Sequence, residues 1–478
     1  MSLPFGLPLT APDAGRKREG AAGIDRAEKV RAHVRAYSEE FVDLLARMVR
    51  QRSISRRDEG VLEMAALEME ILAQAGFEAA MHPTPGQPVI VAHAGPASGE
   101  APQVLIYGHY DVQPPEPLDL WHSPPFEPTL RDGRMYGRGS GDNKGQHLAH
   151  ILGVRVLGDL GLPLPVGVRL ILEGQEESSS PHLDAFVSAN RELLAAELAI
   201  TSDGPMAPGD VPVVAAGVRG ILSFELRVDG ARFDNHSGNK GNVVPDPTWR
   251  LIEALGALRG TDGRVRLPGF YDAVRPVGAV EERVLEALPF DPDATATMLG
   301  LEPERVRSWD GRDYHRRLML EPTFTINAIG SGEIAQDKTI VPAFARVKCD
   351  MRLVADQEPE VVEAAIRAFL AERFPDVQYI GHGHMRPSRT ALDHPAVAAV
   401  AEALGRAHGR QALVHPALGG SLPDYVFTRT LGVPSLIVPY ANADERNHAP
   451  DENMRVDLFL SGIVATTEIL DALGRALR

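Results

Sequence analysis

The sequence predicts an α/β fold, a mostly parallel sheet flanked by helices, into which a second, α+β domain is inserted. Up to about residue 217, short apolar runs alternate with stretches of helical periodicity, an order typical of a parallel sheet covered by helices. From residue 218 the strand-like runs alternate in polarity from one residue to the next. After Pro387 the chain returns to helix, strand and helix. We therefore expect the last part to complete the first domain.

The composition is that of a globular protein with a large negative charge. The chain has 478 residues, of which 44% are hydrophobic and 24% are charged. Its 65 acidic and 49 basic side chains give a formal net charge of -16. This charge argues against a nucleic-acid-binding surface and disfavours binding to anionic membranes. Small or cationic partners are easier to accommodate.

Three features bear on the location of the protein. No uninterrupted apolar run approaches the roughly 20 residues that a membrane helix needs, so we expect a soluble protein. The single cysteine, Cys349, cannot form an internal disulfide, which suits a reducing, cytoplasmic compartment, and we expect it to be a small buried hydrophobe. Residues 1–25 are expected to form a flexible lead-in, since their apolar residues precede their basic ones, the reverse of a secretory signal.

The elements of the first domain, residues 26–217, follow from periodicity. Apolar residues recur at helical spacing from Ala27 to Arg50, which predicts an amphipathic helix. Further helices are predicted around residues 60–75, 145–160 and 183–195. Between the helices lie four apolar runs that are predicted to be strands, PVIVAHAG, QVLIYGHYDV, VGVRLILEG and AELAITSDG.

The inserted domain is predicted to span residues 218–387, and residues 388–478 to close the first domain. Its predicted strands are ILSFELRVDG, EPTFTINAIG and IVPAFARVKCDMRLV, and its clearest helices are PTWRLIEALGALR and EPEVVEAAIRAFLAERF. The closing part is predicted to hold the helix HPAVAAVAEALGRAHG, the strand VPSLIVPY and a last helix from Val456 to Leu473.

Acidic residues and histidines gather in five loops where predicted strands stop or glycines cluster. An isolated Asp before Gly is more often a turn residue, but five such loops supply enough ligands for two cations. Imidazole and carboxylate groups together suit zinc or a similar first-row cation. The carboxyl ends of the strands are also where ligands bind in open α/β sheets. The five loops are GHYDVQP with His109 and Asp111, GSGDNKGQ with Asp142, EGQEESSS with Glu176 and Glu177, TSDGP with Asp203, and ERNHAPDEN with His448.

EGQEESSS places Glu176 and Glu177 side by side at the end of an apolar strand. Successive residues of an extended segment point in opposite directions, so the two carboxylates are expected to have different roles. The nearby serines are expected to be loop formers, because the nucleophile-elbow pattern GxSxG does not occur around them. The phosphate-binding pattern GxxxxGK[ST] also fails, since Lys144 is followed by Gly145.

These segments together resemble the M20 metallopeptidases, most closely the carnosinase-like cytosolic dipeptidases. The resemblance runs from about residue 40 to the end. It implies a zinc-exopeptidase-like catalytic domain, an inserted lid and dimerisation domain, and hydrolysis of dipeptides or short peptides with a free C-terminal carboxylate. The segments that carry it are, in order, LIYGHYDVQP, LWHSPPFEPTLRDGRMYGRGSGDNKGQ, EGQEES, SDGP, DNHSG, PTFTINAI, KTIVPAFARVKCDMRLV, GGSLP and NHAPDEN.

The resemblance implies a set of metal ligands. His109 and Asp203 would bind one divalent cation, Glu177 and His448 would bind the other, and Asp142 would bridge both. The two cations in each subunit are expected to be Zn²⁺, with Mn²⁺ or Co²⁺ as alternatives.

Two further acids would act without binding a cation. Glu176 would be the general base that takes a proton from the water bridging the metals, and Asp111 would hydrogen-bond His109 and fix its orientation. Two cations about 3.5–4 Å apart would lower the pKa of that water and polarise the scissile carbonyl. Asn143 stands where many relatives have a second Asp, a substitution that is expected to preserve the geometry.

Substrate contacts are implied from both domains. His236 in DNHSG would reach from the inserted domain of one subunit of a homodimer into the partner's active site and stabilise the tetrahedral oxyanion. Arg352 would pair with the substrate's carboxylate, unless it forms an ion pair with Asp350 or Glu321. The remaining substrate contacts would come from Asn327, Thr339, Gly420 and Ser421.

The sequence leaves three functions open. The first is a two-metal dipeptidase. The second is an amidohydrolase of the same fold that acts on an N-acyl or N-carbamoyl amino acid, although the narrow HYDVQP and WHSPPFEP motifs and the lid histidine favour the first. The third is a non-catalytic metal-binding or peptide-binding protein, which the intact Glu176 disfavours. Fold alone does not choose among them.

Overall fold

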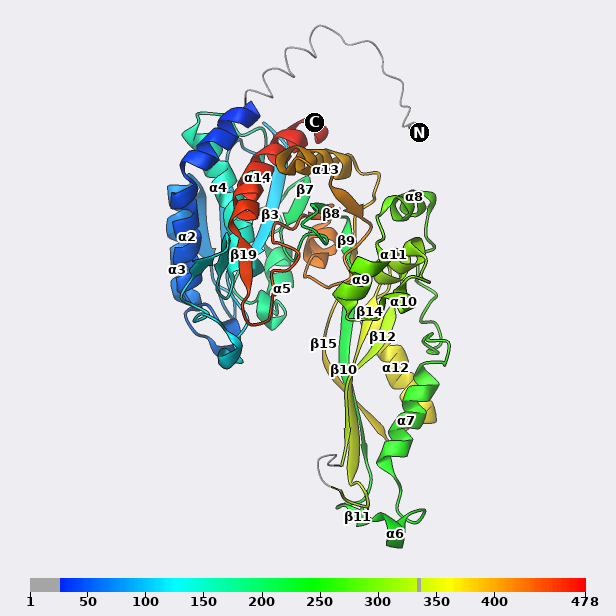
Figure 1. The fold of residues 1–478 in the computed structure, drawn as a ribbon. Coiled ribbons are helices and arrows are strands. Elements are labelled where there is room, and N and C mark those ends of the chain that lie inside the picture. The colour runs from blue at the N-terminus through cyan, green and yellow to red at the C-terminus, as the bar shows by residue number, and fades with distance from the viewer. Residues whose placement is uncertain (1–25, 333–336) are drawn as a thin grey trace.

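The computed structural model describes residues 26–332 and 337–478, and these form two lobes (Figure 1). One lobe is built on an eight-stranded sheet, and the other is elongated and built on a four-stranded sheet. The predicted α/β class with an inserted α+β domain is confirmed. The predicted lead-in, residues 1–25, lies outside the described residues. The exact domain boundaries stay a prediction.

The eight-stranded sheet has a parallel centre, in which β6, β3, β7 and β18 lie side by side and run in the same direction. Antiparallel pairing appears only towards its margins, at β1–β2, β2–β6 and β18–β8. The strands in spatial order are β1 (Glu78–His82), β2 (Val89–Ala94), β6 (Gly167–Glu173), β3 (Gln103–His109), β7 (Leu198–Thr201), β18 (Ser435–Ile437), β8 (Val213–Ala215) and β17 (Leu413–His415).

Helices cover both faces of this sheet, so β3 is buried along its whole length. Val104 and Ile106 of β3 pack into the larger apolar core, whereas Leu105 and Tyr107 pack into a smaller one on the opposite face. The smaller core is covered by α5 (Leu183–Ala189) and the turn η5 (Val426–Leu431). The larger core is covered by α2 (Ser38–Arg50), α3 (Val61–Gln74), α4 (Gly145–Asp159), α13 (Pro395–His408) and α14 (Val456–Ala476).

Two helix predictions need correction. The helix predicted from Ala27 to Arg50 is interrupted at Tyr37, whose φ of -108° and ψ of 15° depart from helical values, so residues 26–36 and α2 are separate segments. The helix predicted over residues 183–195 ends as α5 at Ala189. The following Asn190 has non-helical φ and ψ, and its side-chain amide and its backbone N–H both donate to the Phe186 carbonyl at the end of the helix.

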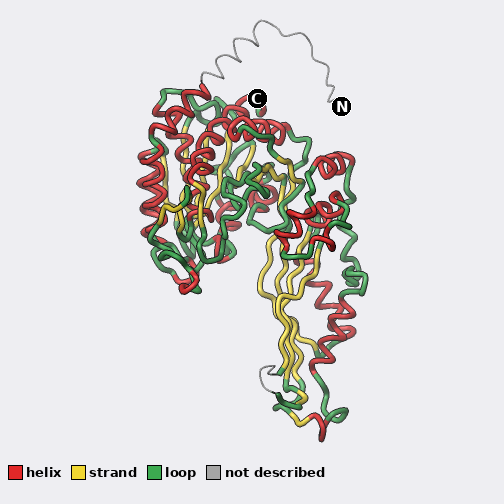
Figure 2. The backbone as a smooth tube through the Cα atoms, viewed as in Figure 1, coloured by secondary structure: helices red, strands yellow, loops and turns green. Residues whose placement is uncertain are grey.

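The second lobe is a long antiparallel sheet with helices against one face (Figure 2). Its strands in spatial order are β12 (Thr323–Ser331), β14 (Phe344–Leu353), β10 (Gly220–Asp229) and β15 (Val377–Met385). The packed helices are α7 (Pro247–Leu258) and α12 (Pro359–Arg373). Asp246 caps α7 by accepting hydrogen bonds from the Thr248 and Trp249 N–H groups. Cys349 on β14 is buried in this core, as predicted.

The far end of the second lobe is a small hairpin-like tip (Figure 1). There β11 (Asn235–His236) pairs with β13 (Ile340–Val341) and is followed by the short helix α6 (Ser237–Lys240). At the opposite end, close to the first lobe, lies a group of short helices, α8 (Ala279–Ala287), α9 (Pro292–Leu299), α10 (Pro303–Val306) and α11 (Gly311–Leu320).

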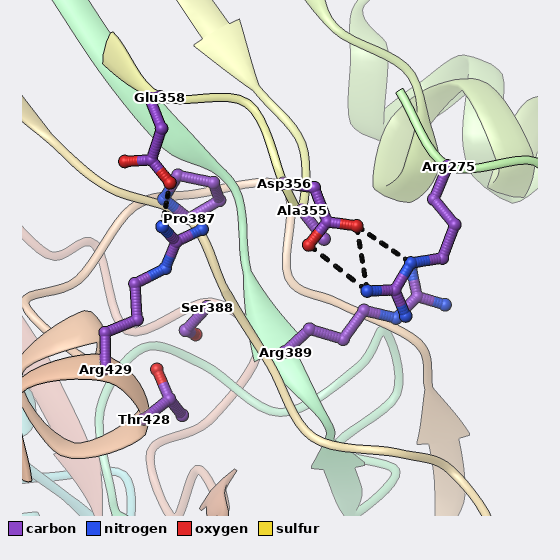
Figure 3. Close-up of a pocket in the computed structure, with 9 residues that line it drawn as sticks. All are labelled: Arg275, Ala355, Asp356, Glu358, Pro387, Ser388, Arg389, Thr428 and Arg429. Carbon is purple, nitrogen blue, oxygen red and sulfur yellow. Dashed lines mark hydrogen bonds and ion pairs between the residues drawn. The ribbon is translucent and has the colours of Figure 1, made fainter. Parts of the chain in front are cut away.

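The two chain segments that connect the lobes pair with each other, as β9 (Gly217–Val218) and β16 (Ser388–Arg389). Beside them lies a cavity of about 480 Å³ lined by residues of both lobes (Figure 3). Arg429 of η5 forms an ion pair there with Glu358, at the start of α12. Arg275 and Asp356 form a second pair at 2.8 Å. The Arg429–Glu358 ion pair and the β9–β16 pairing thus connect the lobes beside this cavity.

Several smaller elements complete the first lobe near the ends of its central strands. A three-stranded sheet joins β4 (Thr129–Arg131), β5 (Arg134–Tyr136) and β19 (Asn453–Arg455), so it connects segments more than 300 residues apart in sequence. The remaining turns are η1 (Ser55–Arg57), η2 (Leu118–Leu120), η3 (Ser140–Lys144) and η4 (Glu176–Ser178).

Candidate metal centre

The four central parallel strands bring the predicted ligands to one edge of the sheet. His109 is the last residue of β3, and Asp203 follows β7 by two residues. Glu177 lies in η4, just after β6, and His448 lies in the loop between β18 and β19. Asp142 lies in η3, which leads into α4. Because carboxyl ends of parallel strands meet at one edge, residues far apart in sequence become neighbours.

Three of these side chains, His109, Asp142 and Asp203, form a buried cluster. The Nε2 atom of His109 lies 3.1 Å from Oδ1 of Asp142 and 3.7 Å from Oδ2 of Asp203. Burial acts to lower the pKa of His109, but its contacts with Asp111, Asp142 and Asp203 outweigh burial and raise that pKa well above its ordinary value.

Asp142 also belongs to a second cluster, with Glu177 and His448. The Nε2 atom of His448 lies 3.1 Å from Oδ2 of Asp142 and 3.2 Å from Oε2 of Glu177. Contacts with these two carboxylates raise the pKa of His448 to about 11. Burial and the neighbouring Asp142 raise the pKa of Glu177 to about 7. The two oxygens of Asp142 therefore face different clusters, the arrangement that a bridging carboxylate requires.

The donor set fits a pair of divalent cations. His109 Nε2 is fully buried and has no hydrogen-bond partner among the described residues, although two carboxylates face it. An unpaired buried nitrogen beside crowded carboxylates is unfavourable unless a positive charge lies among them. Imidazole and carboxylate ligands in this number match zinc and similar first-row metals.

Glu176 is half-buried beside the clusters but belongs to neither. Its carboxylate makes no hydrogen bond or ion pair with any described residue, and burial raises its pKa well above the ordinary value. Glu176 and Glu177 lie on the helical turn η4 and not on an extended segment. The alternating side-chain directions expected from the sequence therefore do not explain why their surroundings differ. The two acids nevertheless have different surroundings, and the different roles expected of them stay a prediction.

Asp111 holds both the histidine and the acidic turn in place. Its carboxylate accepts the N–H groups of Glu176 and Glu177, each at 3.1 Å. Oδ1 lies 3.5 Å from Nδ1 of His109, whereas the Asp111 carbonyl oxygen lies at 3.1 Å from the same atom. The hydrogen bond from His109 Nδ1 thus goes to the Asp111 carbonyl, with the carboxylate farther away, and the predicted role of Asp111 in orienting the imidazole stays a prediction. Gln113 adds a hydrogen bond to Glu177 Oε2 at 2.7 Å.

One group of predicted substrate residues gathers where the lobes meet. Arg352 donates to Ser421 Oγ at 2.7 Å, and its Nε lies 3.6 Å from Asp350. Asp350 also accepts from the Asn327 amide at 2.7 Å. Glu321, the other alternative partner of Arg352, pairs with Arg316 instead. Gly420 precedes Ser421 in the same loop.

The other predicted substrate residues, His236 and Thr339, lie at the far tip of the second lobe (Figure 1). Both are exposed, and the Thr339 carbonyl accepts the Ser237 N–H at 3.0 Å. Within one chain, these two residues are separated from the metal-ligand clusters by the length of the long sheet. The structure therefore does not bring the complete predicted set together in a single copy.

Comparison with known proteins adds to this geometry. The model of the peptidase family M20/M25/M40 matches residues 105–472, which is more than half of the chain and contains both clusters. The chain belongs to the M20 peptidase family.

Named relatives of this M20 chain are similar over most of their length. A Beta-Ala-His dipeptidase of Rattus norvegicus is 30% identical over 368 residues, covering 73% of this chain and 74% of that protein. A Cys-Gly metallodipeptidase of Schizosaccharomyces pombe is 27% identical over 456 residues, covering 89% and 94%. The crystal structure of an M20 family metallo-carboxypeptidase from Sulfolobus solfataricus is 30% identical and superposes with a TM-score of 0.85, covering 91% and 99%.

No helix in the part of this M20 chain that the structure describes combines the length and apolar character needed to cross a membrane.

Two buried acids of the M20 site were not singled out by the sequence analysis. Glu452 is part of the NHAPDEN segment, and its place in that segment was the sequence signal that could have identified it. Its Oε1 accepts the N–H groups of Gly139, Gly141 and Asp142 at 2.9–3.1 Å, and its Oε2 lies 2.5 Å from the Arg138 guanidinium. Glu452 therefore shapes the turn that carries Asp142, the residue that the two clusters share.

Glu445, three residues before His448, is the second buried acid. It is 1% exposed, and neither carboxylate oxygen has a hydrogen-bond partner among the described residues. Burial raises its pKa well above the ordinary value, and the nearby Asp142 raises it further. It adds to the density of acidic groups around the clusters.

Replacing Glu452 by Gln is expected to lower the free energy of unfolding by about 3–5 kcal/mol, because Arg138, which is 1% exposed, would lose its only carboxylate contact among the described residues. Urea denaturation of the metal-free protein measures this change. Glu70→Gln is the matched control, since the Arg47–Glu70 pair is exposed and the same substitution should cost less than about 1 kcal/mol. Equal effects of the two substitutions would contradict the structural role of Glu452.

Proposed function

We propose that this protein is a metallo-dipeptidase that hydrolyses the peptide bond of dipeptides or short peptides with a free C-terminal carboxylate. The observation that carries the proposal is the pair of ligand clusters that share Asp142, with Glu176 beside them and in neither. Membership of the M20 family and the named dipeptidase relatives support the same reaction class. A cytoplasmic location stays a prediction.

In this proposal, His109 and Asp203 hold one divalent cation, Glu177 and His448 hold the other, and Asp142 contacts both. When bound, the cations supply Lewis-acid polarisation of the scissile carbonyl and lower the pKa of water near them. Zn²⁺ is the expected metal, with Mn²⁺ or Co²⁺ as alternatives.

Glu176 moves the proton in the proposed reaction. Its carboxylate has no competing partner among the described residues, so it is free to accept a proton from the attacking water and return it to the departing amine. Burial raises the pKa of Glu176 above its ordinary value, which makes its carboxylate a stronger base. Asp111 keeps this acid in place through the Glu176 N–H.

Arg352 is proposed to anchor the substrate's C-terminal carboxylate. Its guanidinium is partly exposed, and its shortest contact is with the neutral hydroxyl of Ser421 rather than with a carboxylate. The Asp350 contact at 3.6 Å is longer than a good hydrogen bond and leaves donor capacity unused. Ser421 and Gly420 from the first lobe, together with Asn327, complete this end of the proposed substrate site.

A homodimer through the second lobe is proposed to complete each active site. His236 Nδ1 accepts a hydrogen bond from the Gly238 N–H at 3.1 Å, so in the neutral imidazole the proton lies on Nε2. That N–H is available to donate to an oxyanion, while the residue lies far from its own clusters (Figure 1). Thr339 would accompany it.

The exposed surface of the second lobe supports pairing with another copy. Strand β12 lies at the edge of the four-stranded sheet, and its Ile326 and Ile329 side chains are 49% and 53% exposed. At the tip, Phe233 and Val243 are 65% and 79% exposed. An unpaired edge strand with exposed apolar residues is a common contact surface between chains. A two-fold pair would give each active site one partner histidine.

An amidohydrolase acting on N-acyl or N-carbamoyl amino acids is the second candidate, because it too requires a carboxylate anchor such as Arg352. Assays of dipeptides, longer peptides and acylated amino acids with each metal distinguish these functions. Turnover of acylated amino acids alone would replace the dipeptidase proposal, and metal binding without any turnover would favour a non-catalytic protein.

Glu176→Gln is expected to keep both cations bound and to lower kcat by about 10²–10⁴-fold, because only the proton acceptor is lost. Glu177→Ala should instead weaken one cation site, since it removes a ligand of the second cluster. Elemental analysis after gel filtration and steady-state kinetics measure both effects. The assignment would be reversed if Glu176→Gln lost metal while Glu177→Ala kept both ions and full activity.

Arg352→Ala is expected to reduce kcat/KM for dipeptides by an amount equivalent to about 2–5 kcal/mol, because a substrate carboxylate would lose its cationic partner. The C-terminal amides of the same dipeptides should lose far less. Arg352→Lys is the matched control, which keeps the charge but not the planar guanidinium. Equal losses on acids and amides would indicate a structural role for Arg352.

Mixing Glu176→Gln subunits with His236→Ala subunits is expected to restore partial activity, although each variant alone is inactive. One hybrid site would then receive its base from one chain and its histidine from the other. Differently tagged chains verify that subunits have exchanged. Confirmed heterodimers without recovered turnover, or full activity in a monodisperse monomer, would refute the shared site.

A further inference from the structure

The side chain of Asn143 is inserted between two strands that carry metal-ligand candidates. Strands β3 and β7 pair in parallel up to Tyr107 and Thr201. The next bond of such a ladder would join the His109 N–H to the Ser202 carbonyl. The amide of Asn143 takes the place of this bond, since its Oδ1 accepts the His109 N–H at 3.4 Å and its Nδ2 donates to the Ser202 carbonyl at 2.6 Å.

The inserted Asn143 amide is therefore linked to the backbone at or next to each of the three residues of the first cluster. Asn143 itself follows Asp142, it bonds the N–H of His109, and it bonds the residue before Asp203. The bonds to a donor on one side and an acceptor on the other also determine which way the amide faces. Rotation of this side chain would therefore change the relative positions of all three candidate ligands.

A buried imidazole, His147, holds the amide from the other side. Because Asn143 Oδ1 is an acceptor, the His147 Nδ1 atom that lies 3.3 Å from it must donate. The opposite nitrogen, Nε2, lies 2.8 Å from Oε1 of Glu68 on α3. Glu68 and His147 are both 0% exposed, and the second carboxylate oxygen, Oε2 of Glu68, has no hydrogen-bond partner among the described residues. The acid therefore depends on His147 for its hydrogen bonding.

The local backbone leaves room for this arrangement. Gly108 precedes His109, and a Cβ atom at this position would lie 2.5 Å from His147 Cβ and 3.2 Å from Asn143 Oδ1. A side chain there would force the imidazole and the amide away from β3. Glycine at residue 108 thus permits the close approach of α4 to the strand that ends in His109.

We propose that Glu68 and His147 are positioning residues that hold the Asn143 amide between β3 and β7, and thereby set the geometry of His109, Asp142 and Asp203 for cation binding. The proposal rests on the proposed function, which makes these three residues ligands. Neither positioning residue belongs to either ligand cluster. Loss of the His147 hydrogen bond to Asn143 is expected to weaken one of the two cation sites by about 10–100-fold, the range found when groups that orient metal ligands are removed.

Two double variants isolate that hydrogen bond. Glu68→Met removes the buried acid, so that no unpaired carboxylate remains when His147 is changed. In this background His147→Asn keeps an amide donor near the place of Nδ1, whereas His147→Leu has a similar size and no donor. Metal-free protein is titrated with Zn²⁺ by calorimetry, and the unfolding temperature of each metal-free variant is measured alongside.

The Glu68→Met/His147→Asn variant should bind Zn²⁺ at one of the two sites about 10–100-fold more tightly than the Glu68→Met/His147→Leu variant, whatever their unfolding temperatures, because only the first keeps a donor to Asn143. The single variant His147→Gln, which reaches Glu68 but not Asn143, should show the same loss. If Zn²⁺ affinity is equal in the Asn and Leu variants, or follows the unfolding temperature, Glu68 and His147 only stabilise the fold. If the wild-type protein binds none of Zn²⁺, Mn²⁺ and Co²⁺, the proposed function itself fails.

Discussion

The concentration of buried carboxylates at one edge of the central sheet is the constraint on which the rest of the site depends. Asp142, Glu177 and Asp203 are each at most 5% exposed, and Glu445 is buried close to them without a hydrogen-bond partner among the described residues. Burying acidic groups together is unfavourable unless positive charge or protons compensate them. Two histidines provide part of this compensation, and divalent cations are the natural source of the remainder. The ends of the parallel strands converge, so they bring the buried carboxylates and the histidines that compensate them into one place.

Turns at the strand ends are held by side chains rather than by regular secondary structure. Glu452 accepts three N–H groups around Asp142, Asp111 accepts two in the acidic turn η4, and Asn143 replaces a bond of the β3–β7 ladder. Each of these buried polar groups satisfies the backbone and positions a neighbouring ligand candidate at the same time. The site is therefore supported by a second layer of contacts that extends to Glu68 on α3.

The proposed substrate contacts form two separate groups in one copy of the chain. Arg352, Asn327 and Ser421 gather where the lobes meet, whereas His236 and Thr339 lie at the far tip (Figure 1). The four-stranded sheet runs between these two places, so the tip lies away from the clusters of the same chain. This separation is what makes a contribution from a second copy the simplest way to complete the proposed site.

The sequence by itself determined the fold class, the strand ends that carry acids and histidines, and the family, because these depend on local periodicity and on short motifs such as GHYDVQP and NHAPDEN. Only the tertiary structure decided that Glu68 and His147 support Asn143, that Glu452 binds the turn around Asp142, and that the predicted substrate residues fall into two separate groups. It also decided that the first helix is interrupted at Tyr37 and that α5 is short. Most of these features arise from contacts between residues far apart in sequence, 79 positions for Glu68 and His147 and 310 for Asp142 and Glu452, or from local backbone angles that packing selects, and hydrophobic periodicity records neither.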